Sequence, residues 1–281
     1  MNNKTVIAIM YDFDKTLCSK DMQEYSFIPE LGVEASEFWE SATALTKEGM
    51  DSILAYMYLM IKKASANDVC IRRNSFVKLG KDIELFPGVS NYFKRINEYG
   101  ASLGLKIEHY IISSGLKEII EGTSIASEFK QIFACEFFYD VNGVAKWPKM
   151  AVNYTAKTQF LFRINKGCLK QDENLNKFTP DDERRVPFRN MIYVGDGLTD
   201  VPCMKLVKVN GGQSIAVHQD DKSMKIAKQL LNDHRVDFIA KADYSDGSEY
   251  DRILKLILDK MKNVNQLVNE HHRQEKMAAK K

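Results

Sequence analysis

The chain has 281 residues, with 40 Lys and Arg against 38 Asp and Glu, and 44% of its residues are hydrophobic. This composition is typical of globular proteins and argues against intrinsic disorder. A net charge of +2 is too small to indicate a partner surface for nucleic acid or anionic lipid. The longest apolar stretch after the first predicted strand, residues 53–61, is too short to cross a bilayer, so we expect no membrane span.

The start of the chain and its cysteines predict the compartment. Residues 1–5 contain one Lys and lead into an apolar run that ends in acidic residues, unlike a secretory signal peptide. The five cysteines lie at least 33 residues apart and form no CxxC pair. We therefore expect a cytoplasmic protein without a structural zinc site or disulfide bonds.

Short apolar runs alternate with helical patterns along most of the chain. The runs lie at residues 6–11, 110–112, 191–194, 214–217 and 238–240. Strands that alternate with helices predict an α/β fold with a doubly wound, Rossmann-like parallel sheet.

The segment between the first and second runs has no strand pattern. Its apolar residues are spaced as in helices, first at Phe38, Ala42 and Leu45, and then at Ile53, Leu54, Met57, Tyr58 and Ile61. We therefore predict a core of residues 1–17 and 87–262, interrupted by a helical cap of residues 18–86. An amphipathic helix over 248–262 closes the core, and residues 263–281 form a polar tail.

Two other segments interrupt the alternation. Residues 134–152 surround Asn142-Gly143, a dipeptide that favours a two-residue turn and predicts a β-hairpin. Residues 166–190 are polar and predict a loop with one short helix, capped by Thr179 and beginning at Pro180.

The first motif that carries chemistry is Asp12-Phe13-Asp14-Lys15-Thr16, at the end of the first predicted strand. Side chains alternate along an extended chain, so Asp12 and Asp14 can face one site. Two carboxylates this close repel each other unless a cation or a proton lies between them. Turn-forming Asp residues are common after strands, so this motif alone is only suggestive.

The second motif, Gly195-Asp196-Gly197-Leu198-Thr199-Asp200, follows the predicted strand at 191–194. In open α/β sheets, ligands bind at the carboxyl ends of the strands, where both acidic motifs fall. Asp200 can return to the same site from the first helical turn.

A phosphate site is indicated by Ser113-Ser114-Gly115, which follows the predicted strand at 110–112 and opens a helix. Hydroxyl groups beside backbone N–H groups at such a position bind anions. Lys157, at the start of the predicted helix 155–164, is our choice for the cation that meets the same anion. Lys146 and Lys149 are competitors, but they lie in or beside the predicted hairpin.

Together these motifs resemble the haloacid dehalogenase (HAD) superfamily of phosphohydrolases, in particular phosphoserine-phosphatase-like members with a type 1 helical cap. The resemblance implies that Asp12 is the nucleophile and Asp14 the general acid and base. It implies that Ser113, Ser114 and Lys157 bind the phosphoryl group. The residues expected to hold Mg²⁺ are Asp12, Asp14, Asp196 and Asp200.

The implied activity is hydrolysis of a small-molecule phosphate monoester through an aspartyl-phosphate. Polar cap residues that could read the substrate are Asp21, Glu24, Arg72 and Arg73. A phosphomutase on the same scaffold is an alternative, and a phospho-regulatory binding module is a weaker one. The sequence leaves the substrate and the oligomeric state open.

Overall fold

The computed structural model of the chain describes residues 5–279, apart from the side chain of Asp182. Seven strands form one sheet in the order β4-β3-β2-β1-β5-β6-β7. Their bounds are β1 Thr5–Tyr11, β2 Leu105–Leu116, β3 Phe129–Tyr139, β4 Ala145–Met150, β5 Met191–Gly195, β6 Gln213–His218 and β7 Phe238–Lys241. All neighbouring strands are parallel except β3 and β4, which form the predicted hairpin.

Strand β1 lies at the centre of the sheet because its residues 7–11 are apolar and buried on both faces. It pairs with β2 on one side and β5 on the other, so that Tyr11 lies opposite Ile111 and Val194. This register brings the carboxyl ends of the three strands together. The residues that follow them are therefore neighbours, although they are far apart in the sequence.

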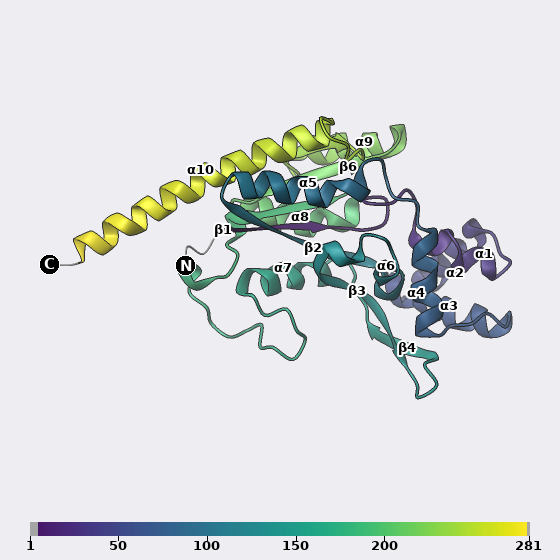
Figure 1. Cartoon of the computed structure of the whole chain (residues 1–281). Helices are drawn as coiled ribbons and strands as arrows, with labels where there is room; N and C mark the ends of the chain where they lie inside the picture. The colour runs from purple at the N-terminus through teal and green to yellow at the C-terminus, as the bar shows by residue number, and fades with distance from the viewer. Residues whose placement is uncertain (1–4, 280–281) are drawn as a thin grey trace.

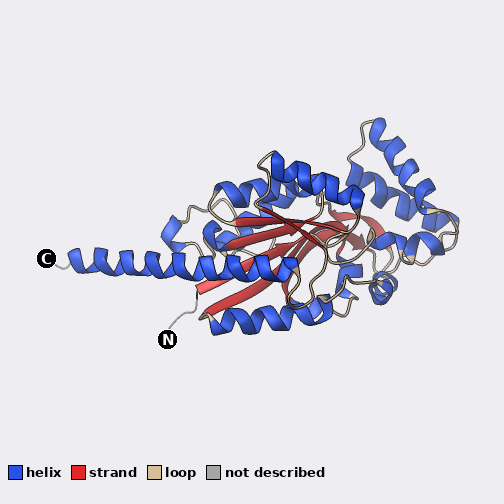
Figure 2. Cartoon of the chain, turned by 90° about the horizontal axis from the view of Figure 1, so that it is seen from above, coloured by secondary structure: helices blue, strands red, loops and turns tan. Residues whose placement is uncertain are grey.

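Helices cover both faces of the sheet, which Figure 2 shows from above. Helices α5 (Val89–Ser102) and α10 (Glu249–Ala278) lie side by side on one face, and the α5 residue Tyr99 donates a hydrogen bond to Asp259 of α10 (Figure 1). On the opposite face lies α7 (Ala156–Lys166), packed beside α8 (Val201–Val209). Helix α9 (Asp221–Asn232) packs on β6 and β7. The predicted α/β architecture is confirmed.

The segment after β1 forms helices at one end of the molecule, beyond the carboxyl ends of the strands (Figure 1). They are α1 (Phe27–Glu30), α2 (Ala35–Lys47), α3 (Ser52–Ala66) and α4 (Arg73–Leu79), with 3₁₀ turns at Met22–Glu24 and Gly80–Asp82. The buried face of α3 agrees with the predicted one only in part. Met57 and Met60 are buried, whereas Leu54 and Tyr58 are partly exposed.

The cap is attached to the core at several places besides its two ends. The backbone beside Arg72 pairs with the turn of the β3–β4 hairpin, where Ala145 N donates to Ile71 O at 2.9 Å. Helix α4 packs against the short helix α6 (Lys117–Glu121) that follows β2. Phe76 of α4 stacks on Phe137 of β3 with ring centroids 5.7 Å apart.

Two predictions about where elements end are wrong. Strand β2 continues to Leu116, because its pairing with β3 resumes at Leu116 after an irregularity. The Ser113-Ser114-Gly115 motif therefore lies in a strand and not at the start of a helix. The helix expected to end near residue 262 continues to Ala278, so the polar tail is largely helical.

The short helix in residues 166–190 is a 3₁₀ turn, Asp181–Glu183, whose N-cap is Pro180 rather than Thr179. Proline has no side-chain group that can accept the capping hydrogen bond. The remaining 3₁₀ turns are Ala126–Glu128, Phe188–Asn190 and Leu198–Asp200. Within residues 5–279, no helix is both long enough and apolar enough to span a membrane.

Candidate active site

Asp12 directly follows β1 and is held by the backbone on both sides. Its N–H donates to Val194 O of β5 at 2.9 Å, and its Oδ1 accepts the N–H of Phe13 at 2.7 Å. Lys15, two residues after Phe13, adopts a left-handed conformation with φ of 56°, which few residues other than Gly adopt. The chain thus turns sharply after Asp14, and only 6% of the Asp12 surface is exposed.

Lys157 lies at the centre of the buried charges. Its Nζ is 3.0 Å from Asp12 Oδ2 and 2.8 Å from Asp200 Oδ1, and its side chain is fully buried. Tyr193 donates a further hydrogen bond to Asp200 Oδ1 at 2.8 Å. Burial disfavours the charged amine, but the two carboxylates outweigh it and raise the pKa of Lys157 above its ordinary value.

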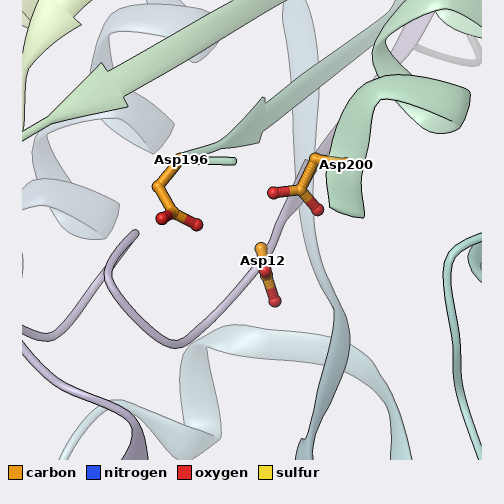
Figure 3. A group of neighbouring side chains, drawn as sticks. All are labelled: Asp12, Asp196 and Asp200. Atoms are coloured by element: carbon orange, nitrogen blue, oxygen red, sulfur yellow. The ribbon is translucent and has the colours of Figure 1, made fainter. Parts of the chain in front are cut away.

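Three carboxylates, those of Asp12, Asp196 and Asp200, converge at this site, as Figure 3 shows. Oxygen atoms of Asp12, Asp196 and Asp200 all lie within 4.8 Å of one another. Burial, followed by the charge of Asp200, raises the pKa of Asp12 to about 6 even though Lys157 opposes the shift. Burial and the same neighbour raise the pKa of Asp196 well above its usual range.

The charges of these side chains indicate whether the site is suited to a metal ion. One ammonium group cannot neutralise three carboxylates, two of them buried, and this imbalance adds to burial in raising the pKa values of Asp12 and Asp196. A divalent cation with oxygen ligands would remove it. The donor set therefore fits a hard divalent cation such as Mg²⁺.

Asp14 occupies a separate position in the site. Its Oδ1 accepts the backbone N–H of Met22 from the cap at 2.9 Å. Burial, followed by the charges of Asp21 and Asp12, raises the pKa of Asp14 well above its usual range. A Cβ atom on Gly115 would lie 2.8 Å from Asp14 Oδ2 and closer still to Met22, so the glycine in the third motif gives these residues room.

The two serines of the third motif have different surroundings. Ser113 is fully buried, and its hydroxyl oxygen accepts the N–H of Gly115 at 3.0 Å. The hydroxyl group of Ser114 donates to Val152 O at 2.7 Å, and Ser114 borders the cavity. The hydroxyl proton of Ser114 is thus already used by the protein.

A cavity of about 400 Å³ opens above the carboxylates. We call its core residues the core wall: Asp12, Asp14, Lys15, Ser114, Tyr154, Asp196, Gly197, Leu198 and Thr199. We call its cap residues the cap wall: Asp21, Gln23, Trp39, Ala42, Thr43, Thr46, Ser52, Ile53 and Tyr56.

Among the four cap residues expected to read the substrate, only Asp21 lines the cavity. It forms an ion pair with Lys15. Glu24 lies behind the wall, where its Oε1 accepts the indole N–H of Trp39 at 2.6 Å. Arg73 pairs with Glu121, and the backbone of Arg72 pairs with the hairpin, so the structure does not bring either arginine to the cavity.

Several residues of the site carry no sequence signal. Tyr193, which orients Asp200, lies in a continuous apolar run, and Tyr56 sits in a helix whose tyrosines and methionines indicate only cap packing. Trp39 and Gln23 belong to no motif. The acidic end of the site was therefore predictable from short motifs, whereas most of the cap wall was not.

Comparisons with known proteins give a family match and solved structures with a similar fold. A family model described as putative phosphatase matches residues 7–257. An uncharacterized protein of Borreliella burgdorferi is 29% identical over 290 residues, which cover 92% of this chain and 99% of that protein.

Solved structures with the same fold include a HAD family hydrolase from Salmonella enterica serovar Typhi. It superposes with a TM-score of 0.59 at 14% identity, covering 89% of this chain and 70% of that one. A phosphoserine phosphatase with an analogue of the phospho-aspartyl intermediate has a TM-score of 0.57 at 18% identity, covering 90% and 99%. At these identities the likeness shows the fold.

Proposed function

This chain belongs to the family of putative phosphatases, and from that premise we propose that it is a Mg²⁺-dependent phosphatase of small-molecule phosphate monoesters. The observation that carries the proposal is the position of Asp12. Its carboxylate is held by Lys157 and by the backbone N–H of Phe13, and it faces a cavity that Asp14 also lines.

Asp12 is the nucleophile. One of its carboxylate oxygens attacks the phosphorus atom while the ester bond to the leaving alcohol breaks, which gives an aspartyl-phosphate. The hydrogen bonds to Asp12 fix its orientation, and such positioning is a large part of catalysis in phosphoryl transfer.

Asp14 is the general acid and then the general base. Burial, followed by the charges of Asp21 and Asp12, raises its pKa and favours the protonated carboxyl group, whose proton passes to the oxygen of the leaving alcohol. The resulting carboxylate accepts a proton from the water that attacks the phosphorus of the aspartyl-phosphate. Phosphate then leaves, and Asp12 is regenerated.

Lys157 and Ser113 are assigned to the phosphoryl oxygens. Lys157 is a fixed cation beside Asp12, and the hydroxyl proton of Ser113 has no acceptor among the described residues. Ser114, whose proton goes to Val152, orients the end of β2 instead.

The carboxylates of Asp12 and Asp196 and the backbone carbonyl of Asp14 would hold Mg²⁺, and Asp200 would orient them. When bound, Mg²⁺ neutralises charge on the phosphoryl oxygens.

The test is phosphate release from 4-nitrophenyl phosphate by the wild-type chain and by Asp12→Asn, with Mg²⁺ and with a chelator. We expect activity only for wild type with Mg²⁺. Asp233→Asn, an exposed position at the end of α9, is the matched control and should behave as wild type. Activity that survives in Asp12→Asn or in the chelator contradicts the mechanism.

A phosphomutase would use the same aspartyl-phosphate but pass it to a second hydroxyl group. Stoichiometric release of inorganic phosphate from several unrelated monoesters, with no transfer to added alcohols, supports the phosphatase over this alternative.

A further inference from the structure

Gln23 is a buried polar residue that the proposed mechanism does not use. It lines the cavity, only 2% of its surface is exposed, and its Oε1 has no hydrogen-bond partner among the described residues. A buried carbonyl oxygen without a partner is destabilising, and such atoms are rare in folded proteins. The oxygen has almost no accessible surface where it lies, but Gln23 borders the cavity, and a rotation of the amide would turn the oxygen toward a ligand that supplies the missing donor.

The neighbours of Gln23 place it beside the leaving group. It lies in the 3₁₀ turn Met22–Glu24, and the preceding residue, Met22, donates its N–H to Asp14. Asp14 is the proposed donor of a proton to the leaving oxygen. A substituent on the leaving alcohol, a few bonds from the leaving oxygen, would therefore lie in the part of the cavity that Gln23 lines.

The charged cap residues on either side of Gln23 are already bonded within the protein. Asp21 forms an ion pair with Lys15, and Glu24 accepts the indole N–H of Trp39. Apart from Asp21, the residues of the cap wall carry no charge. A carboxylate or an ammonium group on the leaving alcohol would have to compete with the Lys15–Asp21 pair, whereas an uncharged alcohol would not.

The rest of the cap wall is suited to hydroxyl groups. Thr43 and Thr46 donate their hydroxyl protons to helix carbonyl oxygens of Trp39 and Ala42, so their oxygens remain available as acceptors. Trp39 is fixed by Glu24 and by an edge contact with Tyr56 at 6.1 Å. The wall thus combines hydrogen-bond acceptors with aromatic surface.

We propose that Gln23 is a specificity-determining residue whose side-chain carbonyl accepts a hydrogen bond from a hydroxyl group of an uncharged polyol phosphate. This inference rests on the proposed phosphatase function and narrows its substrate class. A cavity of about 400 Å³ has room for a polyol with its phosphate.

The first test compares substrates on the wild-type chain with Mg²⁺. Glycerol 1-phosphate is paired with n-propyl phosphate, which has the same carbon chain without the hydroxyl groups. We expect kcat/KM to be at least about tenfold higher for glycerol 1-phosphate, because a site built around a hydroxyl group rejects analogues that lack it. O-phosphoserine and 2-aminoethyl phosphate, which carry charged groups, should also be poorer substrates.

The second test measures the same ratio in Gln23→Leu, with Gln229→Leu on the exposed face of α9 as the control. The preference for glycerol 1-phosphate over propyl phosphate should fall about threefold to tenfold in Gln23→Leu, the effect of one neutral hydrogen bond. It should stay at the wild-type value in Gln229→Leu. Gln23→Glu, which keeps the shape and adds a charge, should raise the rate for 2-aminoethyl phosphate relative to glycerol 1-phosphate.

Two results overturn the inference. One is a wild-type chain that hydrolyses propyl phosphate or a charged monoester as well as glycerol 1-phosphate. The other is a Gln23→Leu variant in which both substrates lose the same factor, as expected of a purely structural residue. The wild-type comparison needs no variant to fold, and hydrolysis of 4-nitrophenyl phosphate separates failure of this inference from failure of the proposed phosphatase.

Discussion

The core wall and the cap wall of the cavity differ in how their polar groups are fixed. On the core side, Asp12 and the residue behind it, Asp200, share the ammonium group of Lys157 and are buried. On the cap side, hydroxyl groups and aromatic rings border the cavity, and the single acidic residue is paired with Lys15. The core wall thus concentrates charge, whereas the cap wall presents neutral hydrogen-bonding groups.

For the proposed phosphatase reaction, this difference assigns recognition of the phosphoryl group and of the leaving alcohol to different walls. Charge develops on the phosphoryl group, so its stabilisation requires fixed charges that need no rearrangement. The leaving alcohol is distinguished by shape and hydrogen bonds, which neutral side chains provide. Substitutions in the core wall should therefore affect stability and rate together, and substitutions in the cap wall should mainly affect substrate binding.

The largest expected effect follows from Lys157→Met. This change leaves Asp12 and Asp200 without their shared cation, and removing one partner of a buried ion pair costs about 3–5 kcal/mol. We expect a loss of that size in the free energy of unfolding, measured by urea denaturation in a chelator, together with loss of phosphate release.

Lys149→Met is the matched control for this prediction. Its side chain is 57% exposed on the hairpin, where it pairs with Glu136. Exposed pairs of this kind contribute at most about 1 kcal/mol. Equal stability of the two variants would show that the charges of the core wall are not interdependent.

Gly195→Ala should have a smaller effect on the same wall. A Cβ atom at this position would lie 2.4 Å from Asp200 Oδ2, so the carboxylate must move. We expect the free energy of unfolding to fall by about 1–3 kcal/mol and kcat to fall at least about tenfold. At Gly197 a Cβ atom meets nothing within 4 Å, so Gly197→Ala should retain wild-type stability. A Gly195→Ala variant as stable as Gly197→Ala would contradict the observed packing of Asp200.

The sequence predicted the core wall except for Tyr154, because its other residues belong to short motifs at strand ends. Parallel pairing of β1 with β5 brings Asp12 next to the Gly195–Asp200 motif, and this follows from the fold class alone. The helix that carries Lys157 was likewise predictable from its position after the hairpin.

The cap wall depends on how helices pack, which apolar spacing does not determine. The predicted face of α3 included Leu54 and Tyr58, yet neither lines the cavity. Tyr56, which the pattern did not include, does line it, because α3 packs against α2 and the hairpin. Arg72 was an expected substrate contact, but its backbone is used by the hairpin. Charge and polarity identified candidates on the cap, whereas tertiary packing decided which of them line the site.

Glu108→Gln tests an ion pair that lies outside the cavity, and we expect it to affect stability but not activity. Glu108 lies near the start of β2, on the same strand as the motif serines, and accepts hydrogen bonds from Arg185 and Lys130. Burial opposes its ionisation, but these partners lower its pKa from 4.5 to about 2. The unfolded chain therefore binds more protons between these two pH values, so the stabilisation is complete above about pH 4.5 and is lost as pH falls toward 2.

At neutral pH we expect Glu108→Gln to lower the free energy of unfolding by about 1–2 kcal/mol, since its partners are partly exposed. Its acid denaturation between pH 4.5 and 2 should be less steep than that of wild type, and phosphate release should be retained. Glu98→Gln, exposed on α5, is the control. An unchanged acid profile in Glu108→Gln would show that this cluster does not contribute to stability.

The smallest effect is expected for Trp39→Phe, which tests the cap wall directly. The substitution keeps an aromatic ring in the cavity but removes the N–H that Glu24 accepts at 2.6 Å. Because this hydrogen bond fixes the ring and takes no part in the chemistry, KM for glycerol 1-phosphate should rise about twofold to fivefold while kcat changes little. The other tryptophan of the chain, Trp147, is 71% exposed on the hairpin, and Trp147→Phe should leave both constants unchanged. A fall in kcat as large as that of Gly195→Ala, with KM unchanged, would place transition-state stabilisation on the cap wall and remove the distinction between the two walls.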